Sequence, residues 1–359
     1  MLRRRMTVAV VALALVGSAA GGTAAAEMAG GTPGLPSSFQ WSSSGVLMSP
    51  KPDAIENAVS VKDPTVVRYK GDWLVYGTTA DTTGDWSLFG TVFDDWSQAD
   101  SARQYHLEEE SGVGAGYRAA PHLFYFAPDK EWYLVYQTGL PSYSTTDDPT
   151  DPTSWSARRN FQSSMPDVVR DNIGNGFWLD YWVICDEEMC YLFSSDDNGH
   201  LYRAETTVEE FPNGFGNTKI VLSDPNRFRL FEGGSVYKIE GSNKYLLVVE
   251  AIGSNGRYFR SWTADSLDGT WTPLADTETN PFAGNANVVF PDGAWTREIS
   301  HGELIRSGID QTMPIDPDCL QFLYQGRDPA SGGDYSQLPY RLGLLTQIKS
   351  GKPCTADSD

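Results

Sequence analysis

Three acidic residues of this chain lie among apolar neighbours. Asp63 stands in Val61-Lys62-Asp63-Pro64-Thr65, Asp180 in Leu179-Asp180-Tyr181, and Glu232 in Phe231-Glu232-Gly233. An ionised carboxylate is costly in such surroundings unless a partner stabilises it. Carboxyl groups that lie close together also push their pKa values apart, so that one is protonated while another is ionised. Glycoside hydrolysis needs such a pair, with one carboxyl to protonate the leaving oxygen and one to activate water.

A repeated apolar strand relates these acids to one another. Its five copies are Trp73–Tyr76, Trp132–Tyr136, Tyr191–Phe193, Tyr245–Val249 and Leu320–Tyr324, and Tyr76, Tyr136, Phe193, Val248 and Tyr324 follow one another at steps of 60, 57, 55 and 76 residues. A second apolar strand precedes each copy, and at its start lies Asp63, His122, Asp180, Glu232 or His301. Repeats of this length predict an all-β fold, a five-bladed β-propeller in a single domain. The five residues would then converge on its axis. A single acid could equally cap a turn or pair with a nearby Lys or Arg, but three at equivalent positions favour a shared site.

Aromatic residues recur about 20 positions after each repeated strand. Trp96, Trp155, Phe211 and Trp271 follow the first four copies, and Trp41 supplies the fifth from the N-terminal side. We expect these residues to pack one blade onto the next. An N-terminal strand would join the last blade and close the ring, which removes exposed sheet edges. No helix of ten residues or more is expected, and residues 107–111 allow one helical turn at most.

The N-terminus has the pattern of a secretory signal, with Arg3, Arg4 and Arg5 before an apolar run and Ala24-Ala25-Ala26 as the cleavage site. We therefore expect a signal peptide over residues 1–26, a flexible leader over 27–38, the propeller over 39–354 and a tail over 355–359. The protein would be secreted and extracellular. Four cysteines then predict two disulfides. The short turn between Cys185 and Cys190 favours a bridge there, with Cys319–Cys354 as the second, and the sequence leaves the connectivity open.

The chain is strongly acidic, with a formal net charge of −20 that becomes −23 when the three arginines of the signal are removed. This charge argues against nucleic-acid binding, which needs a basic surface. It gives no support to a membrane surface as partner, and no later segment is long enough to span a bilayer. A neutral ligand fits best, and like charge favours a monomer. Alternatively, the negative charge serves only to keep a secreted protein soluble and says nothing about its ligand.

Several stretches of the chain together resemble glycoside hydrolase family 62. They are Lys62–Thr65, Gly116–Pro121, Trp182–Asp186, Phe193–Arg203, Arg257–Trp262, Ile299–Glu303 and Gln337–Arg341. Members of that family are inverting α-L-arabinofuranosidases on five-bladed propellers. The resemblance therefore implies release of arabinofuranosyl side groups from arabinoxylan and arabinoxylo-oligosaccharides.

The resemblance also implies a role for individual residues. Asp63 would be the general base, Glu232 the general acid, and Asp180 the residue that tunes the acid and orients the sugar. Lys62 and Tyr335 would line the arabinose pocket. The remaining substrate contacts would come from Ser336 and Arg118, and His301 would lie beside a calcium ion. Either axial histidine could instead have a purely structural role.

Departures from the family pattern bear on rate and substrate preference more than on reaction type. Gly233-Gly234 replaces the usual Ala-Ser after the acid, Ser336 replaces Asn, and His122 replaces Gln. The same acids would also serve an arabinanase or a β-xylosidase on a related five-bladed propeller. A non-catalytic sugar-binding propeller is a third possibility, although the five unlike residues at the blade starts favour one catalytic centre. The polymer backbone is expected to cross the propeller face on Tyr143, Asn285 and Asn287.

Overall fold

A computed structural model describes residues 34–53 and 56–354, which belong to one compact unit. The predicted signal peptide, the leader as far as residue 33 and the tail over 355–359 lie outside the described residues. Within the described ranges, no helix is long and apolar enough to cross a membrane. The secondary structure there is almost entirely β, as predicted.

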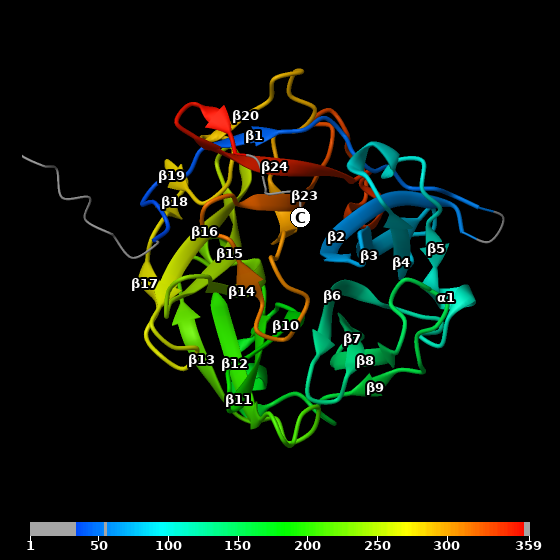
Figure 1. Ribbon diagram of the computed structural model, residues 1–359, viewed down its shortest axis with the longest axis vertical. Helices are drawn as coiled ribbons and strands as arrows, with labels where there is room; N and C mark the ends of the chain where they lie inside the picture. The colour runs from blue at the N-terminus through cyan, green and yellow to red at the C-terminus, as the bar shows by residue number, and fades with distance from the viewer. Residues whose placement is uncertain (1–33, 54–55, 355–359) are drawn as a thin grey trace, which may run out of the picture. The chain divides into compact units, whose positions relative to one another are not determined.

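Five mainly antiparallel sheets surround a common axis and form a five-bladed propeller (Figure 1). Blades 1 to 3 have four strands each, numbered outward from the axis: β2 (Ala58–Tyr69), β3 (Asp72–Asp81), β4 (Trp86–Phe93) and β5 (Tyr105–His106); β6 (Ala119–Phe126), β7 (Glu131–Gln137), β8 (Pro141–Thr146) and β9 (Arg159–Asn160); β10 (Leu179–Cys185), β11 (Met189–Ser195), β12 (His200–Thr207) and β13 (Gly216–Ser223). The repeated strand of the sequence is the second strand of every blade, so the repeat length is the blade length.

Blades 4 and 5 carry additional short strands. Blade 4 contains β14 (Glu232–Ile239), β15 (Tyr245–Gly253), β16 (Gly256–Ala264), β17 (Thr272–Pro273) and β22 (Pro314–Ile315); blade 5 contains β21 (Ser300–Leu304), β23 (Gln321–Gly326), β24 (Arg341–Lys349), β1 (Trp41–Ser43), β20 (Val288–Val289) and β25 (Lys352–Pro353). A separate small sheet pairs β18 (Asp276–Thr277) with β19 (Asn280–Pro281). The innermost strands β2, β6, β10, β14 and β21 contact one another around the axis.

The N-terminal strand closes the ring. Strand β1 pairs antiparallel with β24, with Trp41 opposite Gln347 and Ser43 opposite Leu345. The last blade therefore combines one strand from the start of the chain with five from its C-terminal part. This confirms the predicted closure of the ring by an N-terminal strand.

Aromatic residues fill the spaces between neighbouring blades, as predicted. Trp155 of blade 2 donates a hydrogen bond from Nε1 to the Tyr76 hydroxyl of blade 1, at 3.1 Å. The rings of Phe211 and Phe126, from blades 3 and 2, lie 4.4 Å apart. Trp41 is fully buried and donates to the Phe282 carbonyl before β20. These contacts stabilise the fold because they bury apolar surface. Since the rings meet at defined distances and angles, the contacts also set the spacing between neighbouring blades.

Helices are short and few in the described part of the chain. The predicted turn is α1 (Leu107–Glu110), and a second helix, α2 (Asp167–Asn172), was not predicted; three 3₁₀ turns are η1 (Trp96–Gln98), η2 (Arg227–Arg229) and η3 (Tyr335–Gln337). Both predicted disulfides are present, Cys185–Cys190 across the β10–β11 hairpin and Cys319–Cys354 between the last blade and the C-terminal segment.

Candidate active site

A β-bulge interrupts the innermost strand of every blade near its start. The register against the second strand shifts between Lys62 and Thr65, Ala119 and His122, Leu179 and Trp182, Glu232 and Ser235, and Ser300 and Gly302. The first bulged residue of four blades has a left-handed backbone: φ is 47° at Asp63, 48° at Ala120, 55° at Asp180 and 64° at Gly233. Bulges re-aim side chains, and left-handed non-glycine residues concentrate at functional sites.

The bulges correct one part of the sequence interpretation. The structurally equivalent residues are Asp63, Ala120, Asp180, Gly233 and His301, because each is the first residue left unpaired by its bulge. The prediction that His122 and Glu232 occupy the same position was therefore wrong. Glu232 comes one residue earlier and is equivalent to Lys62, whereas His122 comes two residues later. The extra residue of a bulge leaves no signal in the apolar pattern, which explains the error.

A ring of hydrogen bonds connects the bulges of successive blades. In four of the five junctions, a polar side chain on the second strand of one blade accepts the backbone N–H of the next bulge. The acceptors are Thr78 for Ala120 (2.8 Å), Gln137 for Asp180 (2.9 Å), Glu250 for His301 (2.5 Å) and Gln325 for Asp63 (2.7 Å). The equivalent residue of blade 3 is Ser195, whose hydroxyl is buried without a hydrogen-bond partner. Asp180 Oδ2 takes its place and accepts from Gly233 N–H at 2.7 Å.

A cavity of about 1110 Å³ opens at this end of the axis. Seven of the eight predicted site residues line it: Lys62, Asp63, Asp180, Glu232, His301, Tyr335 and Ser336. Arg118 is not among the lining residues; its guanidinium donates to the Tyr117 carbonyl, and Tyr117 itself lines the cavity. The cavity is far larger than one sugar ring, so there is room for a side group and part of a polymer.

Asp63 and Asp180 face the same imidazole. His301 Nδ1 lies 3.4 Å from Asp63 Oδ1 and 3.8 Å from Asp180 Oδ2. Burial opposes the charged imidazole, but Asp180 and Asp63 outweigh it and raise the pKa of His301. Burial raises the pKa of Asp180 to about 7. His301 opposes this shift, and the negative charges of Glu232 and Asp63 add to it. A buried carboxyl whose pKa lies near neutral pH is a feature of hydrolase sites that divide acid and base roles between carboxyls.

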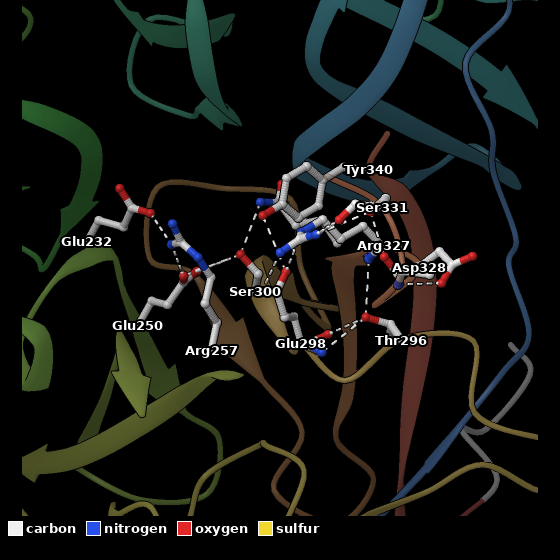
Figure 2. Close-up of polar contacts among 12 residues, drawn as sticks. Glu232, Glu250, Arg257, Thr296, Glu298, Ser300, Arg327, Asp328, Ser331 and Tyr340 are labelled. Atoms are coloured by element: carbon white, nitrogen blue, oxygen red, sulfur yellow. Dashed lines mark hydrogen bonds and ion pairs between the residues drawn. The ribbon is translucent and has the colours of Figure 1, made fainter. Parts of the chain in front are cut away.

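Glu232 is held by an arginine that it shares with a second glutamate. Arg257 Nη1 donates to Glu232 Oε1 and to Glu250 Oε1, and lies between the two carboxylates (Figure 2). Glu250 is fully buried and also accepts from the Ser300 hydroxyl. Burial raises the pKa of Glu250, while Arg257 opposes that shift. Since Gln325 bonds both Ser300 and Asp63 N–H, a continuous chain of contacts links the backbone of the base candidate to the acid candidate.

Lys62 extends into an aromatic cage. Its ammonium lies 3.7 Å from the centre of the Trp86 ring, 4.5 Å from that of Tyr335 and 5.4 Å from that of Tyr340. Burial lowers the pKa of Lys62, although Asp63 and Glu232 favour its charged form. Cation–π contacts and nearby carboxylates hold this buried cation in place. The result is a hydrogen-bond donor at the cavity wall, beside Asp63.

Comparison with known proteins agrees with this geometry. The model of glycosyl hydrolase family 62 matches residues 40–346. The chain belongs to this family. It is 46% identical to α-L-arabinofuranosidase C of Cellvibrio japonicus (strain Ueda107), over 87% of this chain and 47% of that protein, and so spans about half of its length.

Solved structures of other family 62 proteins share the fold. The catalytic domain of a Coprinopsis cinerea GH62 α-L-arabinofuranosidase is 57% identical, with a TM-score of 0.85 over 87% of this chain and 98% of that one. A GH62 hydrolase in complex with xylotriose is 50% identical, with a TM-score of 0.84 over 87% and 98%. The fold and family predicted from the sequence are thus confirmed.

Several cavity residues of this family 62 protein had no predicted role. Trp86, Gln137, Asp197 and Arg257 line the cavity, and Glu250 and Gln325 support it from behind. A signal for part of this set exists in the sequence. Gln137, Glu250 and Gln325 are polar residues at or just after the end of the apolar repeated strand, where a buried polar side chain needs a partner.

Two of the three predicted contacts for a polymer backbone were wrong. Tyr143 is buried among Tyr133 and Phe161, and Asn287 is buried and donates to the carbonyls of Phe39, Pro281 and Phe282. Neither these two residues nor Asn285 lines the cavity. Asn287 holds the closing N-terminal segment through its bonds to Trp41 N–H and the Phe39 carbonyl, and Asn285 lies next to it in the chain, whereas Tyr143 packs within blade 2.

A second, much smaller cavity of about 20 Å³ lies on the axis beneath the site. Its lining includes His122, His301 and Glu303, and it is large enough for one water-sized occupant. His122 Nε2 bonds the Val183 carbonyl, which leaves Nδ1 buried and without a partner, 4.0 Å from Glu303 Oε2. No group of three or more His, Cys, Asp or Glu side chains within the described ranges could hold a metal ion. A cation at this place would therefore depend on water for most of its ligands.

Proposed function

We propose that this protein is a secreted, inverting α-L-arabinofuranosidase that removes arabinofuranosyl side groups from arabinoxylan and arabinoxylo-oligosaccharides. The observation that carries this proposal is the convergence of Asp63, Asp180 and Glu232 in one cavity, in a chain 57% identical to the catalytic domain of an α-L-arabinofuranosidase. Three unlike carboxyls in one cavity favour catalysis over binding alone.

The proposed reaction is a single displacement. Asp63 acts as the general base, because Gln325 holds its backbone while its carboxylate remains available to a water molecule. Glu232 acts as the general acid and protonates the departing xylose oxygen. The water attacks the anomeric carbon from the opposite face, which inverts its configuration. This geometry requires the two carboxyls to lie roughly 6.5–9.5 Å apart.

Asp180 is proposed to orient the sugar and tune the acid. Its Oδ2 is bonded to Gly233 N–H, next in the chain to Glu232, so the two side chains are fixed relative to each other. Lys62, Tyr335 and Ser336 are proposed to line the arabinose pocket. The larger part of the cavity would then receive the xylan backbone, in keeping with the xylotriose bound by a family 62 relative.

Product analysis by NMR on a defined arabinoxylo-oligosaccharide tests this function. We expect free arabinose whose first-formed anomer is inverted, and no cleavage of the xylose backbone. Glu232→Gln should abolish hydrolysis while keeping much of the binding. Release of arabinose from linear arabinan alone would favour an arabinanase, and release of xylose a β-xylosidase. Binding without any product would support a sugar-binding propeller. Hydrolysis by Glu232→Gln at near the parent rate would show that the acid is assigned wrongly.

Secretion is proposed from the N-terminal signal pattern together with the two disulfides, which persist in oxidising compartments. Mass spectrometry of the mature protein from culture medium should give an N-terminus at Glu27. A monomer is proposed from the high negative charge, and light scattering in solution at physiological salt would test it.

A calcium ion is proposed to bind at the axis with His301 as one ligand. The water-sized cavity beside His301 and the unpartnered His122 Nδ1 support a polar occupant. Such an ion would lend positive charge to the floor of the site. Metal analysis of the purified protein, with and without chelator, should give about one calcium per chain. An unchanged melting temperature after chelation, with no metal detected, would contradict this proposal.

A further inference from the structure

The general-acid candidate has a second carboxyl neighbour that the mechanism above does not use. Asp197 lies in the turn between β11 and β12 and lines the same cavity as Glu232, and a hydrogen bond between the two carboxyls is one of the causes that raise the pKa of Asp197. Asp197 Oδ1 is buried, and no donor within the described residues bonds to it. Two carboxyls this close cannot both ionise without strong repulsion.

The chain holds Asp197 in this place through its neighbours. Its backbone is left-handed, with φ of 53°. The preceding Asp196 is fully buried; its Oδ1 accepts the N–H groups of Asn198 (2.8 Å) and His200 (3.1 Å). Its Oδ2 accepts His200 Nδ1 (2.7 Å) and the Tyr202 hydroxyl (2.8 Å). Asp196 thus fixes the turn and leaves the Asp197 side chain to face the cavity.

Contacts on the outer side of the turn add to this support. Asn198 Nδ2 donates to the Asn172 carbonyl at the end of α2, at 2.8 Å. A Cβ at Gly176 would lie 1.9 Å from the Asp196 carbonyl oxygen, so only glycine allows this approach. A turn held on both sides at a left-handed residue is a costly arrangement for a surface loop.

Glu232 has one oxygen free to meet this neighbour. Arg257 engages Glu232 Oε1, and the second oxygen points away from the guanidinium in Figure 2. An arginine alone would favour the ionised form of Glu232, which is the wrong form for an acid catalyst. A second carboxyl beside the other oxygen of Glu232 has the opposite effect, because its negative charge favours the protonated form of Glu232.

We propose that Asp197 is a positioning residue for the general acid, with which it forms a carboxyl pair that shares one proton and so keeps Glu232 able to donate. This inference rests on the proposed function. The charged groups that face Asp197 are Glu232 from β14, Asp180 from β10 and Arg227 from η2. Burial raises the pKa of Asp197 to about 9. The negative charges of Glu232 and Asp180 add to this shift, and the positive charge of Arg227 opposes it. The pair then retains its proton through the neutral range, in the manner of other paired carboxyls.

The isosteric variant Asp197→Asn tests the pair, with two readouts. The first is the pH profile of kcat/KM for arabinose release from an arabinoxylo-oligosaccharide. Without its carboxyl partner and still beside Arg257, Glu232 should lose its proton more easily. The limb at high pH should therefore move down by about one pH unit or more. Above neutral pH, kcat should fall with little change in KM.

The second readout is the melting temperature as a function of pH. Because the pKa of Asp197 is raised from 3.8 to about 9, the folded parent keeps a proton that the unfolded chain loses in this window, and its stability falls as pH rises. Asp197→Asn removes that loss. Its melting temperature should rise relative to the parent from pH 5 to pH 9. A residue that only held the turn together would give a lower melting temperature at every pH.

Two further variants complete the experiment. Asp171→Asn removes one negative charge from exposed α2 and should leave both profiles unchanged. Asp197→Glu keeps a carboxyl and should restore much of the high-pH limb. An active parent with an unchanged limb in Asp197→Asn overturns this inference alone. A parent that releases no arabinose overturns the proposed function, and this inference with it.

Discussion

Two junctions of the propeller solve the same structural problem with different residues. Between blades 5 and 1, Gln325 accepts the backbone N–H of Asp63. Between blades 3 and 4, Ser195 stands in the place of Gln325, and its hydroxyl has no hydrogen-bond partner among the described residues, so the side chain of Asp180 accepts the backbone N–H of Gly233. In the first junction a supporting residue holds the backbone, and the side chain of the acid faces His301 without taking part in that support. In the second, the acid itself is part of the support.

This difference bears on the roles of the two aspartates. A general base must approach water and accept its proton, which suits a carboxylate with no backbone donor to satisfy. A carboxylate fixed to the backbone beside Glu232 suits orientation and tuning. The assignment of Asp63 as base and Asp180 as orienting residue is thus supported by what holds each one.

The largest predicted effect separates the two aspartates. Asp63→Asn should lower kcat about 10²–10⁴-fold with little change in KM, because the base is lost. Asp180→Asn keeps an oxygen that can accept from Gly233 N–H. Its effect should be the smaller one, about the worth of a hydrogen bond to a charged group, or roughly 10–150-fold in kcat/KM. Initial rates of arabinose release measure both.

An Asp180→Asn variant as inactive as Asp63→Asn would contradict the different roles of the two aspartates. Asp180 would then take part in proton transfer directly, and its bond to Gly233 N–H would be incidental. Glu27-terminated mature protein should serve as the parent in both cases, with circular dichroism to establish that each variant is folded.

The residue before each bulged aspartate gives the next effect in size. It is Lys62 in blade 1 and Leu179 in blade 3, so at this position a cation enters the cavity from blade 1 and not from blade 3. Lys62→Met should raise KM and lower kcat/KM by roughly 10–150-fold, since a charge-assisted hydrogen bond to the sugar is lost. Lys238→Met is a matched control, because Lys238 stacks on Tyr245 at 4.4 Å but does not line the cavity. A similar KM in both variants would contradict a sugar contact by Lys62.

The fold was predictable because each blade repeats one local pattern. An apolar strand, a turn and a second apolar strand can be recognised within about 20 residues, and the aromatic contacts between blades recur at fixed positions after them. The acids were recognisable because a carboxyl among apolar residues is unusual anywhere. Family motifs then supplied Lys62, Tyr335 and Ser336, all of which line the cavity.

The supporting residues were not predictable in the same way. Gln325 and Asp63 are 262 positions apart, and nothing local links them. The bulges shift the register by one residue without changing the apolar pattern, so His122 and Glu232 were placed one or two residues from their true positions. Asp197 lies within the family-like stretch Phe193–Arg203, but the sequence predicted no role for it, because its partner Glu232 belongs to a different blade.

Removal of the Gln325 side chain, which supports the Asp63 bulge at the first junction, should lower stability more than it lowers the rate of the reaction. Gln325→Met leaves Asp63 N–H buried without an acceptor and also removes the bond to the Ser300 hydroxyl. The free energy of unfolding should fall by about 1–3 kcal/mol. Activity should fall as well, through a looser Asp63 bulge. Chemical denaturation and arabinose release measure the two effects, and an unchanged stability would mean that Asp63 N–H finds another acceptor.

The smallest predicted effect comes from the equivalent residue of the second junction. Ser195→Ala removes a hydroxyl that is buried and has no hydrogen-bond partner, so no bond is lost and a desolvation cost disappears. The free energy of unfolding should stay within about 0.5 kcal/mol of the parent or rise slightly. The same denaturation experiment measures it beside Gln325→Met. A loss of 1 kcal/mol or more would mean that the Ser195 hydroxyl supports the fourth bulge after all. Asp180 would then be less firmly committed to the backbone, and the distinction drawn between the two aspartates would lose its structural basis.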